Sequence, residues 1–216
     1  MSPSSTSPRR TQAERTATTR TALLEATVAA LAEHGYARAS TADIARRAGV
    51  SRGAQLHHFP AKLDLVSAAL DHVFAEREAE FRRRFTQRPP SERTQAGAVA
   101  ALWEINQGPE HLAFMELLTA ARTDSELRPL GRRVLGQFEA GVAQVFADVL
   151  PGVADDPSTP QRVLLALTVV QGAALHQQLG MNPQADDLVA TLAALADAFP
   201  VGAAAPVIPP TEAGMP

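Results

Sequence analysis

The 216-residue chain contains no cysteine and has only one lysine, one tryptophan and one tyrosine. The lack of cysteine excludes disulfide bridges, thiolate metal sites and a thiol nucleophile. No stretch approaches the roughly 18 unbroken apolar residues of a membrane-spanning helix. The polar, basic N-terminal segment also lacks the apolar core of a standard secretion signal. We therefore expect a cytoplasmic protein without a membrane span.

Charge of the two signs is unevenly distributed along the chain. Residues 1–60 hold eight arginines and four acidic residues, a balance of +4. Residues 61–216 hold twelve basic and nineteen acidic residues, a balance of −7, which gives the overall net charge of −3. A basic head on an acidic body predicts that only the head meets a polyanion.

Apolar residues recur at spacings of three and four without the alternation of β-strands, which predicts an all-α fold. Gly35 is placed to end a first helix. Ser40 is placed to cap a short second helix that ends before Gly49. Ser51 is placed to cap a third helix that runs through His58. A fourth helix follows, with these residues expected to be buried: Leu63, Val66, Leu70, Val73 and Phe74.

The remaining periodic segments predict five further helices and a two-domain organisation. The helices are expected near 92–107, 109–127, 129–149, 159–179 and 184–198. Composition divides the chain into a flexible basic arm, a three-helix head, a larger helical domain and a flexible tail. These parts are residues 1–15, 16–62, 63–200 and 201–216.

The segment 41–66 reads as two short helices separated by a glycine-containing turn, which predicts a helix-turn-helix. The residues expected to pack against the first helix are Ile44, Ala45, Ala48 and Val50. The residues expected to face outward from the third helix are Arg52, Ala54, Gln55, His57 and His58.

The outward face suits the major groove of DNA. Gly53 and Ala54 keep its leading edge slim, whereas Arg52 and Gln55 can reach guanine and adenine edges. Lys62 lies in the first turn of the fourth helix, where the helix dipole also attracts phosphate. The predicted DNA-contact residues are Ser40, Thr41, Arg52, Gly53, Ala54, Gln55, His57, His58 and Lys62.

Over about residues 20–72 the chain resembles the DNA-binding module of the TetR family of regulators. The resemblance rests on Gly35-Tyr36, Asp43-Ile44-Ala45, Ala48 to Ser51, Gly53, His58-Phe59 and Lys62. The family usually has a Leu-Tyr pair before the histidines, where this chain has Gln55 and Leu56. This departure favours Leu56 as the buried member of the pair and Gln55 as the base-reading one.

The resemblance implies a homodimeric regulator with a helical effector-binding domain. We expect a repressor that leaves a palindromic operator when a small, largely hydrophobic molecule binds. An activator or a partner-protein-binding regulator of the same fold is the alternative. Leucine stripes on the last two predicted helices suit a four-helix dimer interface. The residues assigned to it are Leu164, Leu175, Leu188, Leu192 and Leu195.

The second domain mixes apolar walls with a few polar groups, as a ligand pocket requires, although ordinary core packing is the alternative for each residue. The candidates are Trp103, Asn106, Phe114, Met115, Leu118, Arg122, Phe138, Leu167, Gln171 and His176. Arg122 is equally consistent with a surface position. No nucleophile elbow, phosphate loop or metal-ligand spacing is present, so we expect no enzyme activity, cofactor or metal.

The arginines of the N-terminal segment admit two interpretations. They could form an arm that enters the minor groove, or a solvated tail. The residues concerned are Arg9, Arg10, Arg15 and Arg20. Arg46 and Arg47 likewise could touch phosphate or remain solvated.

Overall fold

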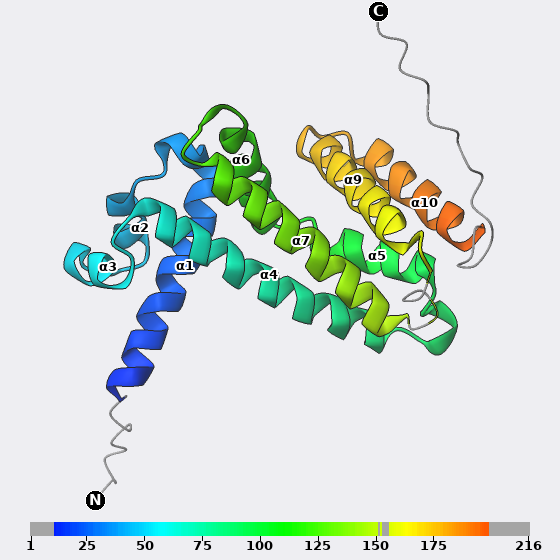
Figure 1. The fold of residues 1–216 in the computed structure, drawn as a ribbon, viewed down its shortest axis with the longest axis horizontal. Coiled ribbons are helices and arrows are strands. Elements are labelled where there is room, and N and C mark those ends of the chain that lie inside the picture. Colours follow the sequence, from blue (N-terminus) through cyan, green and yellow to red (C-terminus); the bar gives the residue numbers. More distant parts are fainter. Residues whose placement is uncertain (1–10, 151, 153–155, 199–216) are drawn as a thin grey trace, which may run out of the picture. The chain divides into compact units, whose positions relative to one another are not determined.

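The computed structural model describes residues 11–150, 152 and 156–198, and these residues form helices and no strand. The predicted all-α fold is confirmed. The elements are α1 (Gln12–Arg38), α2 (Thr41–Arg47), α3 (Arg52–His58), α4 (Lys62–Gln87), the 3-10 helix η1 (Pro90–Glu92), α5 (Gln95–Ile105), α6 (Pro109–Thr123), α7 (Arg128–Val149), α9 (Thr159–Gln178) and α10 (Asn182–Ala198) (Figure 1).

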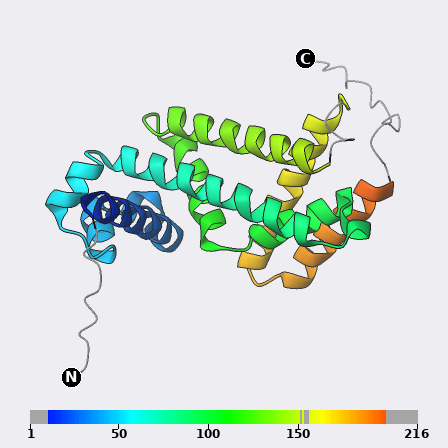
Figure 2. The ribbon, with the colours of Figure 1, turned by 90° about the horizontal axis from the view of Figure 1, so that it is seen from below.

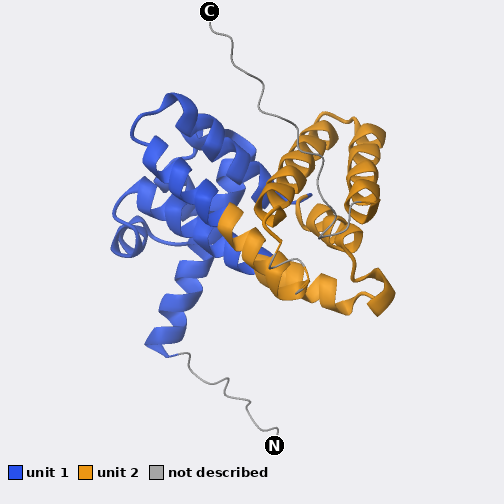
Figure 3. Cartoon of the chain, turned by 45° about the vertical axis from the view of Figure 1, so that its right-hand side comes forward, with its two compact units in different colours: residues 1–77, 107–138 blue, residues 78–106, 139–216 orange. Residues whose placement is uncertain are grey.

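The chain divides into two compact units (Figure 3). Unit 1 comprises residues 1–77 and 107–138, and unit 2 comprises residues 78–106 and 139–216. Helices α4 and α7 each contribute their N-terminal part to unit 1 and their C-terminal part to unit 2. Each unit therefore contains segments that are far apart in the sequence.

Unit 1 is built around α1, which packs against α2 and α6, while α2 packs against α3 (Figures 1 and 2). Leu23, Leu31 and Ile44 are completely buried in this unit. Burying apolar side chains of this size stabilises each position by about 1.5–3 kcal/mol. The short helices α2 and α3 therefore have a rigid support.

Helix α1 begins earlier than the sequence indicates. Thr11 and Glu14 form a capping box: Thr11 Oγ1 accepts from the Glu14 amide at 3.2 Å, and Glu14 Oε2 accepts from the Thr11 amide at 2.7 Å. The expectation of a flexible arm is therefore wrong for residues 12–15, which are helical. Arg20 also lies in α1, with its guanidinium 4.8 Å from the centre of the Phe59 ring. Arg9, Arg10 and the predicted tail 201–216 lie outside the described residues.

Gly35 interrupts the helical geometry of α1 where the sequence predicts that the helix ends, but α1 continues to Arg38. Its φ of 72° lies in the left-handed region that glycine adopts without steric cost. A Cβ atom at this position would also lie 2.8 Å from Glu116 Oε2. The chain changes direction at Gly35, and the helix then continues for about one turn to Arg38. This change of direction positions the start of α2.

The N-terminal part of α4 is buried through Leu65, Val66 and Leu70. The prediction that Leu63 is buried is wrong, because this residue is 38% exposed and Leu65 lies in the core in its place. Arg133 of α7 donates to Ser67 Oγ at 2.6 Å and to Asp71 Oδ1 at 3.0 Å. These bonds tie α7 to α4 within unit 1.

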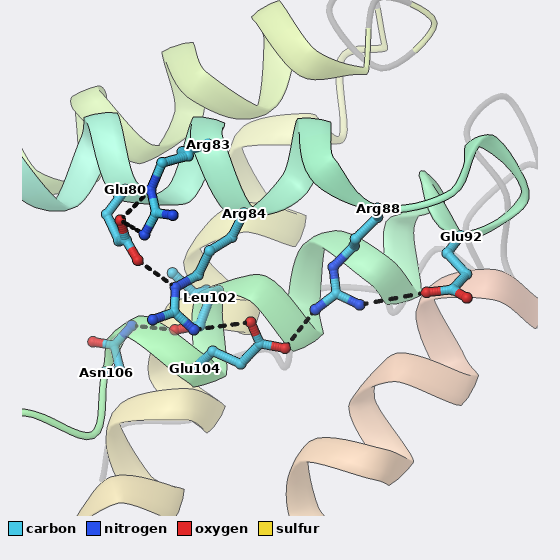
Figure 4. Close-up of polar contacts among 8 residues, drawn as sticks. All are labelled: Glu80, Arg83, Arg84, Arg88, Glu92, Leu102, Glu104 and Asn106. Carbon is cyan, nitrogen blue, oxygen red and sulfur yellow. Dashed lines mark hydrogen bonds and ion pairs between the residues drawn. The ribbon is translucent and has the colours of Figure 1, made fainter.

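In unit 2, α10 packs against α5 and α9. Arg84, in the last turn of α4, and Arg88, the residue after that helix, both bind Glu104 of α5, with nitrogen–oxygen distances of 3.3 and 2.5 Å (Figure 4). No helix within the described part of the chain is long and apolar enough to cross a membrane.

Candidate nucleic-acid interface

Two serine caps and one glycine shape the α2–turn–α3 segment. Ser40 Oγ accepts from the Asp43 amide at 3.1 Å, and Ser51 Oγ accepts from the Ala54 amide at 3.2 Å. Between the two helices, Gly49 has a φ of 66°. Both predicted caps are therefore confirmed, and the turn contains the glycine that its left-handed backbone favours.

The exposed face of α3 consists of Arg52, Gly53, Leu56 and His57, while Ala54 and His58 are half-buried. The rings of His57 and His58 meet edge to face, with their centres 5.7 Å apart. This surface combines a cation, a glycine and imidazole nitrogens.

Gln55 faces inward, so its predicted position on the outer surface is wrong. Its side chain is completely buried, and Nε2 donates to the Phe59 carbonyl oxygen at 2.7 Å. The assignment of Leu56 to the buried side is also wrong, because Leu56 is 44% exposed. Gln55 and Phe59 are four residues apart and share the inner face, where Gln55 satisfies a carbonyl at the end of α3.

Replacing Gln55 with alanine is expected to lower the free energy of unfolding by about 2 kcal/mol, because it removes a buried hydrogen bond and leaves a cavity. Denaturant unfolding measures this change. Leu56→Ala is the matched control and should cost less than about 1 kcal/mol, since the Leu56 side chain is already partly in water. A larger loss for Leu56→Ala than for Gln55→Ala would contradict the orientation of α3.

The two arginines of α2 both pair with acidic side chains of the protein. Arg46 forms an ion pair with Asp43, and Arg47 Nε lies 2.8 Å from Asp43 Oδ2. Arg47 also donates to Glu33 Oε2 at 2.8 Å and contacts His34 Nε2 at 2.7 Å. Hydrogen bonds from both arginines lower the pKa of Asp43. Arg47 thus connects α2 to α1.

Lys62 is half-buried at the first position of α4. Its ammonium group donates to the Tyr36 carbonyl oxygen and lies 3.9 Å from the centre of the Tyr36 ring. Burial lowers the pKa of Lys62. The lysine thereby joins the start of α4 to the backbone that follows Gly35.

Comparison with known proteins identifies this arrangement. Residues 23–69 match the family model described as bacterial regulatory proteins of the tetR family. The HTH-type transcriptional regulator Rv2912c of Mycobacterium tuberculosis is 34% identical over 180 residues, which span 82% of this chain and 92% of the relative. The chain belongs to the TetR family. It is a DNA-binding regulator of transcription, as these relatives are regulators of transcription.

A further relative and two solved structures also resemble this chain. CymR of Pseudomonas putida, also an HTH-type transcriptional regulator, is 36% identical over 142 residues, or 66% of this chain and 70% of the relative. The TetR-family regulator from Cytophaga hutchinsonii has the same fold, with a TM-score of 0.65 at 15% identity over 88% of this chain and 98% of its own. A TetR regulator from Haloarcula marismortui gives a TM-score of 0.63 at 22% identity, covering 84% and 98%.

The structure distributes the predicted ligand-binding residues of this TetR-family protein over both units. Phe74, which was predicted to be buried but not to bind a ligand, is half-buried and joins Phe114 and Phe138 in an aromatic cluster of unit 1. Arg122, in the same unit, is exposed, which agrees with the alternative interpretation of this residue as a surface arginine. The other predicted residues of unit 1 are Met115 and Leu118, and those of unit 2 are Trp103, Asn106, Leu167, Gln171 and His176.

The polar candidate Asn106 is already engaged. It is 2% exposed, and its Nδ2 donates to the Leu102 carbonyl oxygen at 2.6 Å (Figure 4). This bond holds the end of α5. Unit 2 also contains an apolar cavity of about 260 Å³, whose wall includes Val99, Phe146 and Val163 but none of the predicted ligand residues.

The leucines assigned to the dimer interface lie on α9 and α10 of unit 2. Leu164, Leu175, Leu188 and Leu195 are between 40% and 52% exposed. Leu192 is only 8% exposed, so the expectation that it lies on an outer stripe is wrong. A groove of about 470 Å³ runs between the two helices, and its wall includes Leu165, Leu188 and Leu195.

Proposed function

We propose that this TetR-family protein is a repressor whose dimer binds a palindromic operator and leaves it when a small molecule binds. The observation that carries the proposal is the exposed Arg52-Gly53 start of α3 on a capped, buried support. Arg52 would read a base edge in the major groove. A Cβ atom at Gly53 would meet no protein atom within 4 Å, so close approach of DNA is a reason for glycine here.

Phosphate contacts would surround this helix and fix its register on the duplex. The residues proposed for them are Ser40, Thr41, His58 and Lys62, with Ala54 and His57 facing the groove. Lys62 would exchange its bond to Tyr36 for a phosphate oxygen, or share its three N–H donors between them. Gln55 has no place in this set because it is buried. A bacterial regulator bound to its operator acts in the cytoplasm.

The proposed dimer pairs the α9–α10 face of one copy with the same face of a second copy. The half-exposed Leu164, Leu175, Leu188 and Leu195 support this pairing, because a twofold axis would place like stripes together and remove them from water. Two recognition helices would then read major grooves about 34–36 Å apart.

Ligand binding would favour a dimer with a different spacing of its heads. A difference in ligand affinity worth about 1–3 kcal/mol between the two states would lower operator affinity about 5- to 150-fold. The proposed mechanical link is α4, because this continuous helix starts beside the DNA-binding segment and contributes to both units.

Footprinting on the DNA that flanks the gene tests the proposal. We expect protection of a palindrome whose half-sites are about one helical turn apart, and loss of protection when an effector is added. A reporter under the same promoter should rise when the gene is deleted. A reporter that falls on deletion would overturn repression in favour of activation, and an absence of protected DNA would overturn the operator proposal.

A further inference from the structure

Unit 1 contains a half-buried arginine, Arg77, with two buried nitrogen atoms that have no hydrogen-bond partner in the described part of the chain. Arg77 lies on α4, and the two atoms are its Nε and Nη2. Burial lowers the pKa of Arg77 to about 10, against an opposing effect of Glu110. The guanidinium therefore remains charged at neutral pH. A buried charged group without hydrogen-bond partners lowers the stability of the folded protein. A functional role for Arg77 would explain why the protein contains such a group.

A second buried polar group without a hydrogen-bond partner lies in the same unit. His111 of α6 is 2% exposed, and its Nε2 is buried with no partner in the described part of the chain. Burial, and then the positive charge of Arg77, lower the pKa of His111 to about 4. The imidazole is thus neutral at pH 7, where it can donate one N–H. The ring contact between Phe74 of α4 and Phe114 of α6 joins the two helices that carry Arg77 and His111, and the charge of Arg77 acts on His111.

Aromatic rings adjoin both groups along their helices. Phe74 is three residues before Arg77 on α4, and Phe114 is three residues after His111 on α6, so each ring lies about one turn from its polar neighbour. The Phe74 and Phe114 rings are 5.5 Å apart between centres, and both contact Phe138, at 5.3 and 4.9 Å. Unpaired polar groups next to an apolar aromatic wall are typical of a site for an amphipathic small molecule.

We propose that Arg77 and His111 bind the carboxylate of an acidic effector whose apolar body lies against Phe74, Phe114 and Phe138. This inference rests on the proposed function and names the chemical class of its effector. A carboxylate would accept from two guanidinium N–H groups and from the imidazole, and would supply the missing countercharge. A single negative charge fits better than a dianion, because the site offers one cation and Glu110 adds negative charge to its surroundings.

Matched pairs of acids and neutral amides test the proposal. The probes are phenylacetate with phenylacetamide and octanoate with octanamide, added to the full-length protein at pH 7.5 without DNA. Calorimetry should give binding of at least one acid, with its amide about 10- to 100-fold weaker. Arg77→Met should weaken binding of that acid by a similar factor, whereas Arg77→Lys should retain part of it. Arg122→Met is the matched control, because Arg122 is an exposed arginine of the same unit, and should bind as the wild type does.

The stability of Arg77→Met separates this site from a purely structural ion pair. With no ligand present, the variant should unfold at the same or a higher temperature than the wild type, since it removes an unpaired buried charge. A marked drop in the unfolding temperature would indicate that Arg77 and Glu110 form a structural pair, and would overturn the proposal. Failure of both acids to bind, or equal binding of acids and amides, would also overturn it.

Measuring the release of operator DNA by the same acids and amides separates failure of this inference from failure of the proposed function. An acid that binds through Arg77 without releasing operator DNA would leave the carboxylate site intact and disprove ligand-controlled repression. Release of the operator by the amides, unchanged in Arg77→Met, would support ligand control and overturn the carboxylate site.

Discussion

Replacing both Leu188 and Leu195 with glutamate is expected to yield a monomer of 22.9 kDa and to weaken operator binding about 10²- to 10⁴-fold. The two leucines are seven residues apart on α10, and both line the groove between α9 and α10. Carboxylates placed on both copies of an apolar twofold interface would be desolvated next to like charges, at a cost of several kcal/mol.

The loss of DNA affinity follows from the loss of linkage between two heads. In a dimer, binding of the first half-site holds the second head near its own site at a high effective concentration. A monomer lacks this advantage, although each head keeps its own contacts. Light scattering after size exclusion measures the mass, and a titration of operator DNA measures the affinity.

Ala190→Glu provides the control for added charge on the same helix. Ala190 is exposed and does not line the groove, so this variant should remain dimeric and bind DNA nearly as well as the wild type. If the double leucine variant stays dimeric, the interface lies elsewhere on the protein. If it becomes monomeric but binds operator at full strength, the requirement for two linked heads is wrong.

The positions of the helices were accessible from the sequence because their signals are local. Ser40 and Ser51 cap helices through their own hydroxyl groups, and Gly35 and Gly49 adopt left-handed backbone that other residues disfavour. These determinants act within a few residues, so spacing alone reveals them. The start of α1 has an equally local capping box at Thr11 and Glu14, which the expectation of a loose arm overlooked.

The orientation of α3 was not accessible in the same way. A leucine normally ranks above a glutamine for burial. In this helix Gln55 is buried because it shares the face of Phe59 and donates to that residue's carbonyl, and Leu56 is consequently turned outward. A helix of seven residues has too few apolar positions to define its inner face by periodicity.

The proposed effector site depends still more on tertiary structure. Phe114 and Phe138 were identifiable as candidates, but Arg77 and His111 carry no sequence signal that separates them from a surface arginine and a core histidine. Their significance comes from buried donors without partners, which only the packing of α4 and α6 within unit 1 reveals. Asn106 is the opposite case: the sequence predicted it as a ligand-binding residue, but its side-chain amide already donates to the Leu102 carbonyl oxygen.

Changing Arg52 to alanine is expected to abolish most of the preference for operator over random DNA. One bidentate arginine–guanine contact contributes about 1–3 kcal/mol of discrimination, and a dimer would lose two such contacts. The combined loss of about 2–6 kcal/mol corresponds to about 30-fold or more in operator affinity, whereas binding to random DNA, which depends on phosphate contacts, should change little. Arg52 is exposed at the first position of α3, so its removal should leave the free energy of unfolding almost unchanged.

Arg46→Ala supplies the comparison that separates base reading from simple loss of positive charge. Arg46 is an exposed arginine on α2 that pairs with Asp43, and its removal should weaken operator and random DNA by similar, small factors. Titrations with both DNAs at several salt concentrations resolve the two effects, because the salt slope reports phosphate contacts and the affinity ratio reports base contacts. If Arg52→Ala lowered the salt slope but kept the affinity ratio, Arg52 would be a phosphate contact, and base reading would have to come from His57 or from the shape of the DNA.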